Sequence, residues 1–532
     1  MDKRRRGSGL ILILISLLFL QVSCCENSGP PRITVKIAIP YEDRLSGIDN
    51  QYYKSWLEEQ SGVSIDFTFI PQTYSSEYLR LLFTSDDSDV DAVFFSEQSA
   101  LSPEELEYYG MNGYLLPLEE LINKKGHYFT EAAAAYQDCC LLQAIIESDG
   151  HIYYLPAADA SRAERYTQIM FINAKWLEKL KLPIPTTTDE FRDTLAAFAQ
   201  AYPNALPLIG SSDNDSIQPV HFLMNSFTVC DPVNGYFAVD NGSVYFAPIT
   251  AEWREGIRYC RSLYLAGLLP KQIFTFTEKQ MIGVANDPQD LVGVFTAKNM
   301  ADVLSENSPE LLSHYQFVPP LTGPEQAGFS IAEIKRPRPG GVILSSSKNY
   351  DAVFRLMDLM CSEDAYLIGH YGEHDADWAQ ASVGDITIFG EPAVITIKNP
   401  ELFQRNVVSG VTGPFIGNSK YTDGIAWKGY QINQSEYLAA RAYRSYKPYE
   451  PPESLCMIHF SDNASEKKKQ MEDISGYIKK WMKWWITGVE DIDDNAAWNE
   501  YLDGLYSMNL KKLLESIQIT YEEMRKNNET VH

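Results

Sequence analysis

The chain has 532 residues, of which 45% are hydrophobic and 22% charged, and its formal net charge is −26 at pH 7. This composition is typical of a globular protein with room for two or three domains and excludes a disordered chain. The negative charge argues against nucleic acid and anionic lipid as partners, since both require a positive field, and leaves neutral and cationic ligands open.

The N-terminus carries the parts of a secretory signal peptide. Basic residues at 3–6 precede an aliphatic core at 10–20, and the segment ends in QVSCC at 21–25. As a helix this core reaches about 16 Å, roughly half the hydrocarbon thickness of a bilayer, so it is too short to remain as a spanning helix. The cysteines resemble the lipidation site of a bacterial lipoprotein, with Cys24 as the expected lipidated residue and Cys25 as the alternative. An ordinary secreted protein with chance cysteines is the competing interpretation.

We therefore expect residues 1–23 to be a lipoprotein signal peptide and residues 24–32 a tether. The mature chain would then stand at the extracellular face of the cell membrane, held by its N-terminal lipid. No CxxC pair occurs among the remaining cysteines, which argues against a zinc framework and leaves disulfides and buried thiols open. These cysteines are Cys139, Cys140, Cys230, Cys260, Cys361 and Cys456. We expect no metal and no cofactor.

From residue 33 onward, strands and helices alternate. Apolar periodicity predicts strands at 33–39, 63–70 and 89–95 and helices at 49–60 and 74–83. This order is typical of a parallel sheet covered by helices, in which ligands bind beyond the carboxyl ends of the strands. Ser96, Glu97 and Gln98 follow the third strand and are therefore candidate ligand contacts, although a helix cap explains them equally well.

The rest of the chain continues in the same way. Strands are expected at 150–156, where Pro156 ends the strand, at 167–172, 291–295 and 341–345, and helices at 174–180, 188–201, 251–266 and 351–369. The basic, Pro- and Gly-rich segment 335–341 predicts a loop. From residue 466 onward the chain is helical, and we interpret its tryptophans at 481, 484 and 485 as helix-packing residues. No repeat of solenoid period occurs.

Several segments in consistent order resemble one protein family. GHIYYLP at 150–156, FINAKWLEKL at 171–180 and PTTTDEF at 185–191 are similar to the extracellular solute-binding proteins of ABC importers. YGEHDADW at 371–378 resembles the YGxxGxDW segment of their large lipoprotein subgroup from Gram-positive bacteria, except that His374 and Asp375 replace the usual small residues. The C-terminal ITGVEDID at 486–493 and the pair of segments at 91–96 and 115–121 extend the resemblance over most of the mature chain.

The resemblance implies an α/β, two-lobed periplasmic-binding-protein-like fold of type II, with lobes joined by crossing segments and with additional C-terminal helices. By analogy, we place the crossings near Pro156, Val318 and Gly372. Lobe I would comprise residues 33–156 and 318–372, and lobe II residues 157–317 and 373–480. Residues 481–532 would be C-terminal helices packed on the lobes.

The resemblance also implies a monomeric receptor that captures an oligosaccharide or other small solute and delivers it to the permease subunits of an ABC transporter, without covalent chemistry. Aromatic faces stack on sugar rings, and polar side chains bond to hydroxyls. Our first candidate is Trp378, which follows a crossing segment, although core packing is the commoner role of any single aromatic residue. The further candidates are Asp377, Tyr154, Asp159, Arg162, Tyr166, His221 and Trp427, besides Ser96, Glu97 and Gln98.

Three functions other than solute binding are alternatives for this sequence. HYGEH at 370–374 matches the H-x-x-E-H zinc motif, but Gly372 interrupts the helical spacing that the two imidazoles require. A cell-surface glycan hydrolase would need two carboxylates across a cleft, and the sequence singles out no such pair. A surface scaffold without a small ligand is the third alternative, and it predicts no closure of the lobes on adding any small molecule.

Overall fold

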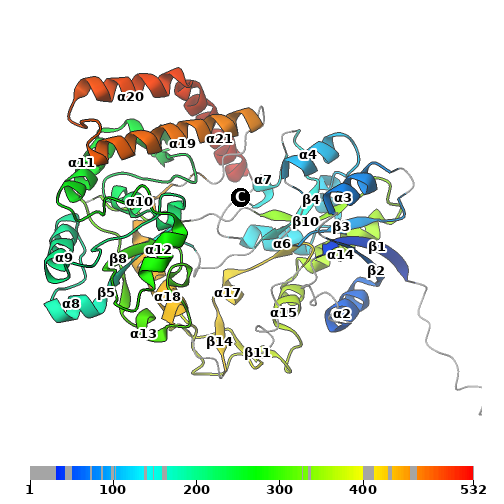
Figure 1. The fold of residues 1–532 in the computed structure, drawn as a ribbon. Coiled ribbons are helices and arrows are strands. Elements are labelled where there is room, and N and C mark those ends of the chain that lie inside the picture. Colours follow the sequence, from blue (N-terminus) through cyan, green and yellow to red (C-terminus); the bar gives the residue numbers. More distant parts are fainter. Residues whose placement is uncertain are drawn as a thin grey trace, which may run out of the picture.

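The computed structural model describes residues 32–530 except 42–50, 72–74, 86–87, 97–100, 102, 137–140, 148, 159–164, 326, 333–336, 400–411, 429–433, 454 and 456–463. The expected signal peptide, the tether up to residue 31 and both candidate lipidation cysteines, Cys24 and Cys25, lie outside these residues. Figure 1 shows two α/β lobes side by side, with the C-terminal helices lying over the second. Within the described chain, no helix combines the length and apolar character that crossing a membrane requires.

The first lobe is built on a six-stranded sheet in the order β13-β4-β10-β3-β1-β2. Its strands are β1 (Ile33–Tyr41), β2 (Val63–Pro71), β3 (Ala92–Phe94), β4 (Tyr154–Ala158), β10 (Arg338–Ile343) and β13 (Phe415–Ile416). The pairs β1–β2, β1–β3 and β13–β4 are parallel, as the alternation of strands and helices predicts. In contrast, β10 runs antiparallel to β3 and β4, because it brings the chain back from the second lobe in the direction opposite to β4.

Helices cover both faces of this sheet (Figure 1). They are α2 (Gln51–Ser61), α3 (Ser75–Phe83), α4 (Pro103–Met111), α5 (Glu119–Lys125), α6 (Tyr128–Ala135), α7 (Leu141–Ala144), α14 (Tyr350–Met360) and α15 (Glu363–Tyr371). The single helix expected at 351–369 is thus two helices. The chain breaks at Ser362, whose side chain accepts a hydrogen bond from the Ala365 amide and so caps α15.

A buried carboxylate joins two of these helices. Asp358 of α14 is 5% exposed, and its oxygens accept hydrogen bonds from the backbone amides of His127, Tyr128 and Phe129 at the start of α6. The first amides of a helix have no partner within it, and Asp358 satisfies those of Tyr128 and Phe129 and shares the His127 amide with the Lys125 carbonyl oxygen. The charge also lies at the positive end of the α6 dipole, which favours it.

The second lobe contains the three-stranded sheet β8-β5-β9 and the hairpin β6–β7. Their bounds are β5 (Ile169–Asn173), β6 (Phe237–Asp240), β7 (Ser243–Phe246), β8 (Val294–Ala297) and β9 (Tyr315–Val318). The three-stranded sheet is antiparallel throughout, in contrast to the parallel sheet that the sequence predicts. The reason is again connectivity, since β5 leads the chain away from the first lobe and both of its neighbours lead back towards it.

Helices surround the second sheet. They are α8 (Ala174–Leu180), α9 (Thr188–Ala201), α10 (Pro219–Met224), α11 (Ala251–Leu265), α12 (Glu278–Ala285), α13 (Pro309–Leu312) and α18 (Gln434–Tyr446), with 3-10 turns η2 (Asp215–Ile217), η3 (Ala247–Ile249), η4 (Met300–Asp302) and η5 (Lys447–Tyr449). The caps that begin α8 and α9 are side-chain hydrogen bonds from local residues, with Asn173 accepting from Trp176 and Thr187 from Glu190. Both helices have the bounds that the sequence predicts.

The C-terminal helices α19 (Ala464–Thr487), α20 (Asn495–Ser507) and α21 (Leu510–Thr530) continue the core of the second lobe. Trp485 is fully buried, and Trp481 and Tyr501 pack against it at ring-centroid distances of 5.1 and 4.8 Å. The helix-packing role expected for Trp481 and Trp485 is confirmed. Because α19 is continuous from 464 to 487, the expected domain division at 480/481 falls inside a helix.

A small sheet lies below the two lobes in Figure 1. It consists of β11 (Trp378–Gln380), β12 (Ile395–Ile397) and β14 (Ile425–Trp427), and the short helix α17 (Ser419–Thr422) precedes its last strand. Its core includes Tyr366 of the first lobe, while Phe389 packs against Tyr443 of α18 in the second, with ring centroids 6.2 Å apart. The segment 373–480 therefore contributes to both lobes and to this sheet, and the expected lobe boundaries stay a prediction.

Replacing Asp358 by Ala should lower the free energy of unfolding by about 2–4 kcal/mol, because three amides lose a charged acceptor in a buried place. Chemical denaturation measures the change. Asp351→Ala is the matched control on the same helix, since that carboxylate forms an exposed ion pair with Lys125 that contributes at most about 1 kcal/mol. Equal losses in both variants would contradict the role given to Asp358.

Candidate functional site

A pocket of the second lobe lies at the edge of the sheet that faces the first lobe. β4 of the first lobe ends at Ala158 and β5 of the second begins at Ile169, so the chain passes from one lobe to the other between these two strands. Thr167 and Gln168, directly before β5, and Lys298, directly after β8, line the pocket. These positions share one edge because β5 and β8 are antiparallel.

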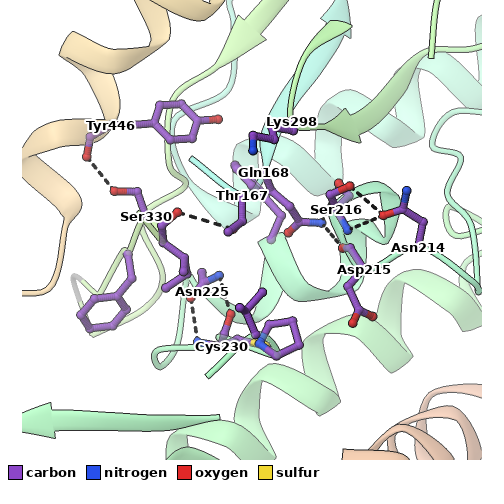
Figure 2. A pocket seen from close by; sticks show the side chains of 15 residues that line it. Thr167, Gln168, Asn214, Asp215, Ser216, Asn225, Cys230, Lys298, Ser330 and Tyr446 are labelled. Atoms are coloured by element: carbon purple, nitrogen blue, oxygen red, sulfur yellow. Dashed lines mark hydrogen bonds between the residues drawn. The ribbon is translucent and has the colours of Figure 1, made fainter. Parts of the chain in front are cut away.

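The pocket combines apolar walls with polar groups and encloses about 840 Å³, part of it open to solvent. Phe222, Phe329 and Ile331 provide apolar surface. Figure 2 shows the polar side chains converging from several elements of the second lobe. The remaining lining residues are Asn214, Asp215, Ser216, Asn225, Cys230, Pro232, Val233, Ser330 and Tyr446. Apolar faces beside fixed polar groups are typical of small-molecule sites.

A polar turn at 214–218 forms one side of the pocket. The Asn214 side chain accepts hydrogen bonds from the amide and the hydroxyl of Ser216 at 3.0 and 2.7 Å. Gln168 holds the turn from within, because its Nε2 donates to the carbonyl oxygens of Asp215, Ser216 and Gln218 at 2.8, 3.1 and 2.9 Å. One side chain thus satisfies three backbone acceptors and fixes the shape of the turn.

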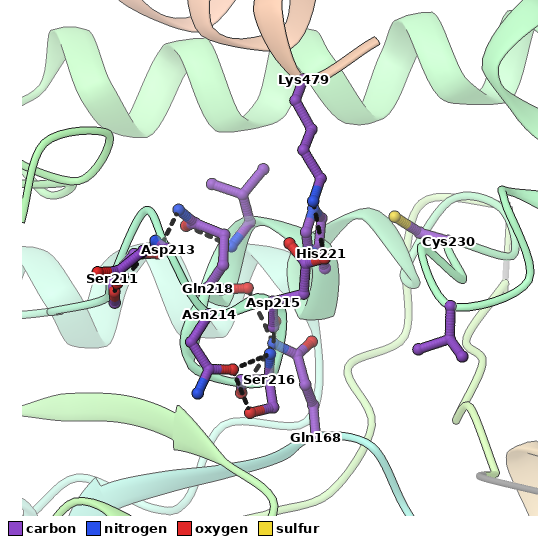
Figure 3. A network of polar contacts seen from close by, with 12 residues as sticks. Gln168, Ser211, Asp213, Asn214, Asp215, Ser216, Gln218, His221, Cys230 and Lys479 are labelled. Atoms are coloured by element: carbon purple, nitrogen blue, oxygen red, sulfur yellow. Dashed lines mark hydrogen bonds and ion pairs between the residues drawn. The ribbon is translucent and has the colours of Figure 1, made fainter. Parts of the chain in front are cut away.

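The same turn is anchored from outside by the C-terminal helices (Figure 3). Lys479 of α19 donates to Oδ2 of Asp215 at 2.8 Å. His221 of α10 is buried, its Nδ1 lies 3.9 Å from Oδ1 of Asp215, and among the described residues this nitrogen has no hydrogen-bond partner. Burial lowers the pKa of His221, although Asp215 acts in the opposite direction, so the imidazole is neutral at pH 7.

Hydrogen bonds of Asn225 also hold the floor of the pocket in place. Asn225 donates to the carbonyl oxygens of His221 and Cys230 and accepts from the Cys230 amide at 2.8 Å. Burial raises the pKa of the Cys230 thiol, which makes it a poor nucleophile. Ser330 donates to the Tyr446 carbonyl oxygen at 2.8 Å, which attaches the wall to α18. The site is therefore built from rigidly held side chains.

A second pocket, of similar size, lies in the first lobe. It is lined by α6, the start of α15 and the residues after β13, and the Gly417 amide there donates to the carbonyl oxygen of Ala158 at the end of β4. This pocket thus lies at the edge from which the chain leaves for the second lobe. Tyrosines and carboxylates dominate its lining, and the Tyr421 hydroxyl donates to Glu363.

The structure brings three of the sequence-predicted residues together in the small sheet, and none of them lines either pocket. Trp378 is 5% exposed, and its indole N–H donates to the Gly372 carbonyl oxygen at 2.9 Å. Asp377 accepts from the Glu373 amide and so closes the turn before β11. Trp427, at the end of β14, packs against the same core. Trp378 is thus held within this small core, and its expected role as a ligand contact stays a prediction.

The other predicted residues lie in the two lobes. Tyr154 and Ser96 are buried in the first, at the start of β4 and directly after β3. Tyr166 is buried in the second lobe, where its hydroxyl donates to Glu450, and His221 lies behind the polar turn. Their contacts are structural, and a role in ligand binding stays a prediction. The remaining candidates, Glu97, Gln98, Asp159 and Arg162, lie outside the described residues.

Sequence reasoning missed most of the pocket. Thr167, Gln168 and Lys298 stand at strand ends that the sequence pattern locates without marking them as a site. The polar run SSDNDS at 211–216 was the one available signal, because such a run directly before a buried helix indicates a structured turn. Its partner Gln168 is 43 or more residues away in the chain, and no local pattern connects them.

One known protein family matches more than half of this chain. The family described as "Bacterial extracellular solute-binding protein" matches residues 46–366. FusA of Streptococcus pneumoniae serotype 4, a fructooligosaccharide ABC transporter substrate-binding protein, is 26% identical over 345 residues. That alignment covers 61% of this chain and 60% of FusA, so it spans less than two thirds of the relative.

Solved structures show the same fold. FusA of S. pneumoniae in complex with kestose has a TM-score of 0.64 at 20% identity, covering 93% of this chain and 100% of FusA. A solute-binding protein of Bifidobacterium longum infantis, described as binding HMO, has a TM-score of 0.67 at 18% identity, covering 93% and 99%. The fold expected from the sequence, two α/β lobes of the type II periplasmic-binding-protein kind with added C-terminal helices, is confirmed.

The two histidines of the HYGEH motif at 370–374 lie on either side of the end of α15. His370 is buried at the end of α15, and its Nδ1 lies 2.9 Å from the Tyr366 carbonyl oxygen. Gly372, with a φ of +86°, ends the helix, and His374 lies beyond it with its side chain half exposed beside Asp375. The helical spacing of the motif is therefore broken where the sequence predicts. Within the described residues, no group of three His, Cys, Asp or Glu side chains could hold a metal ion.

The two histidines should differ in their effect on stability. Burial lowers the pKa of His370 to about 4, although the Tyr366 carbonyl acts in the opposite direction. Between pH 6.5 and 4 the unfolded chain binds a proton that the folded protein does not, so stability falls as the pH falls, by up to about 1.4 kcal/mol per pH unit. His370→Gln should flatten the curve in this window, as measured by denaturation at several pH values. The control His374→Gln should leave it unchanged; identical curves for both variants would refute the assignment.

Proposed function

The chain belongs to the bacterial extracellular solute-binding proteins, and from this premise we propose that it captures an oligosaccharide between its two lobes and delivers it to the membrane subunits of an ABC importer. The observation that carries the proposal is the pocket before β5, at the edge where the second lobe faces the first. A ligand bound there is in reach of the opposite lobe, so its binding favours the closed arrangement of the two.

The chemistry of the pocket fits a sugar. Phe222 and Phe329 offer apolar surface for the C–H faces of sugar rings, while Gln168, Ser216 and Thr167 offer groups that bond to hydroxyls. The relatives support the same class of ligand, since FusA is described in complex with kestose and the Bifidobacterium protein as binding HMO. The first-lobe pocket, lined by Tyr128, Tyr421 and carboxylates, would provide the opposite surface.

We propose further that the protein is a binder and carries out no covalent chemistry. Hydrolysis of a glycoside needs two carboxyl groups about 5–10 Å apart on either side of the bond. Asp215 of the second-lobe pocket has its Oδ2 paired with Lys479, while Glu131, Glu363 and Asp364 line the first-lobe pocket, so the support for a binder comes from the relatives and not from a lack of carboxylates. The relatives named above are substrate-binding proteins, which agrees with this assignment.

The location follows from the N-terminus. With a signal peptide at 1–23 and a lipid on Cys24, the protein would be a monomer tethered at the extracellular face of the cell membrane, close to its permease. The support is the signal pattern in the sequence together with a family whose members are extracellular.

A thermal-shift and calorimetric screen of the protein lacking residues 1–25 tests the proposal. The probes are the neutral trisaccharides kestose, raffinose and maltotriose, with tripeptides and zinc chloride as other ligand classes. A sugar at 100 times its dissociation constant should stabilise the folded state by about 2.7 kcal/mol and raise Tm accordingly.

The alternatives give other results. Release of monosaccharides, followed by chromatography, would identify a hydrolase. A shift with zinc alone would contradict the sugar assignment, and no shift with any probe would favour a scaffold. X-ray scattering with the bound sugar should show a smaller radius of gyration than without it, because the lobes close.

A further inference from the structure

We infer that Gln168 is a specificity-determining residue of the second-lobe pocket, and that its side-chain Oε1 accepts a hydrogen bond from a ligand hydroxyl. The inference rests on the proposed function and deepens it, because it names the group that selects hydroxyl-bearing, neutral sugars over acidic ones. It comes from the way in which the amide of Gln168 is held.

The orientation of this amide is fixed by its partners. Nε2 lies 2.8–3.1 Å from three carbonyl oxygens of the polar turn, those of Asp215, Ser216 and Gln218. All three are acceptors, so the nitrogen must face them, and the flipped amide would bring Oε1 against three other oxygens. Oε1 is therefore held on the opposite side, as Figure 2 shows, where it faces away from the turn.

This oxygen is an acceptor without a donor. Within the described part of the chain, no hydrogen bond to Oε1 is formed, and Gln168, which lines the pocket, is half-buried. An acceptor that is partly removed from water and cannot reorient gains more from a ligand donor than one that moves freely.

The neighbouring polar side chains are already engaged. Asn214 accepts from Ser216 and donates to Glu278, and Asn225 uses both ends of its amide on the backbone of the floor. Ser330 donates to the wall formed by α18. These groups build the pocket, whereas Gln168 both builds it and presents an oriented group to its interior.

The chemical consequence concerns the ligand. A fixed acceptor attracts hydroxyl and N–H donors and repels a ligand carboxylate that is placed against it. Sites that hydrogen-bond a specific hydroxyl discriminate strongly against ligands that lack it, because the acceptor is then left unpaired. A sugar hydroxyl therefore fits the position opposite Oε1 better than the carboxylate of a uronic acid does.

The test compares two glutamines that hold the same turn, by calorimetry with kestose, raffinose, maltotriose and trigalacturonic acid. Gln168→Met removes both the donors and the acceptor. Gln218→Met is the matched control, because Gln218 also holds this turn, through the carbonyl oxygens of Ser211 and Ile273, but does not line the pocket. Both variants should lower Tm. Only Gln168→Met should weaken binding of the neutral sugar, by about tenfold, which corresponds to one hydrogen bond.

A second variant separates the acceptor from the turn. Gln168→Lys keeps donors for the three carbonyl oxygens and removes Oε1, so it should fold with little change in Tm and still lose about tenfold in affinity. Three results would overturn the inference while the proposed function stands. The first is unchanged affinity in Gln168→Lys, and the second is an equal loss of affinity in Gln168→Met and Gln218→Met. The third is tighter binding of trigalacturonic acid than of the neutral sugars by the unaltered protein. If the unaltered protein binds no sugar at all, the proposed function fails and the inference fails with it.

Discussion

The passage of the chain between two lobes is the constraint on which the rest of this structure depends. A strand that leads out of one lobe must end at the edge facing the other, and a strand that returns must begin there. This explains why β10 runs against its neighbours in an otherwise parallel sheet, and why β5 is antiparallel to β8 and β9. It also explains where the pocket lies, because the residues next to these strand ends, such as Gln168 and Lys298, converge at one edge.

Elements that depend on neighbours in sequence could be predicted, and elements that depend on distant contacts could not. The helices α8 and α9 begin at local caps, and their bounds follow from the residues themselves. The strand β10, in contrast, includes Pro339 and Gly340, which read as a loop. A side chain at Gly340 would come within 2.6–2.9 Å of the backbone at Pro414 and Leu155, so this strand requires glycine where three strands approach each other closely.

The candidate site also separates into features that depend on neighbours in sequence and features that depend on distant contacts. Family resemblance predicted the fold and the kind of function, but the residues that line the pocket depend on tertiary partners. Trp378 lies in a recognisable motif, yet its indole N–H donates a hydrogen bond to the Gly372 carbonyl oxygen of its own turn, and its ring packs in a small core. Gln168 lies in no motif, and its importance comes from a turn more than forty residues away. A local motif therefore located a turn here, whereas the lining of the pocket depends on contacts between distant segments.

The small sheet has a consequence for the energetics of opening. It shares a core with the first lobe through Tyr366, while Phe389, only 5% exposed, packs against Tyr443 of the second. Any motion that separates Phe389 from Tyr443 returns apolar surface to water, at a cost of up to about 2 kcal/mol for a phenyl ring. Under the proposed function, a motion of the lobes that separates these rings would make the balance of open and closed forms depend on a hydrophobic contact that does not itself line the second-lobe pocket, so a substitution there would change the affinity for a ligand without touching it.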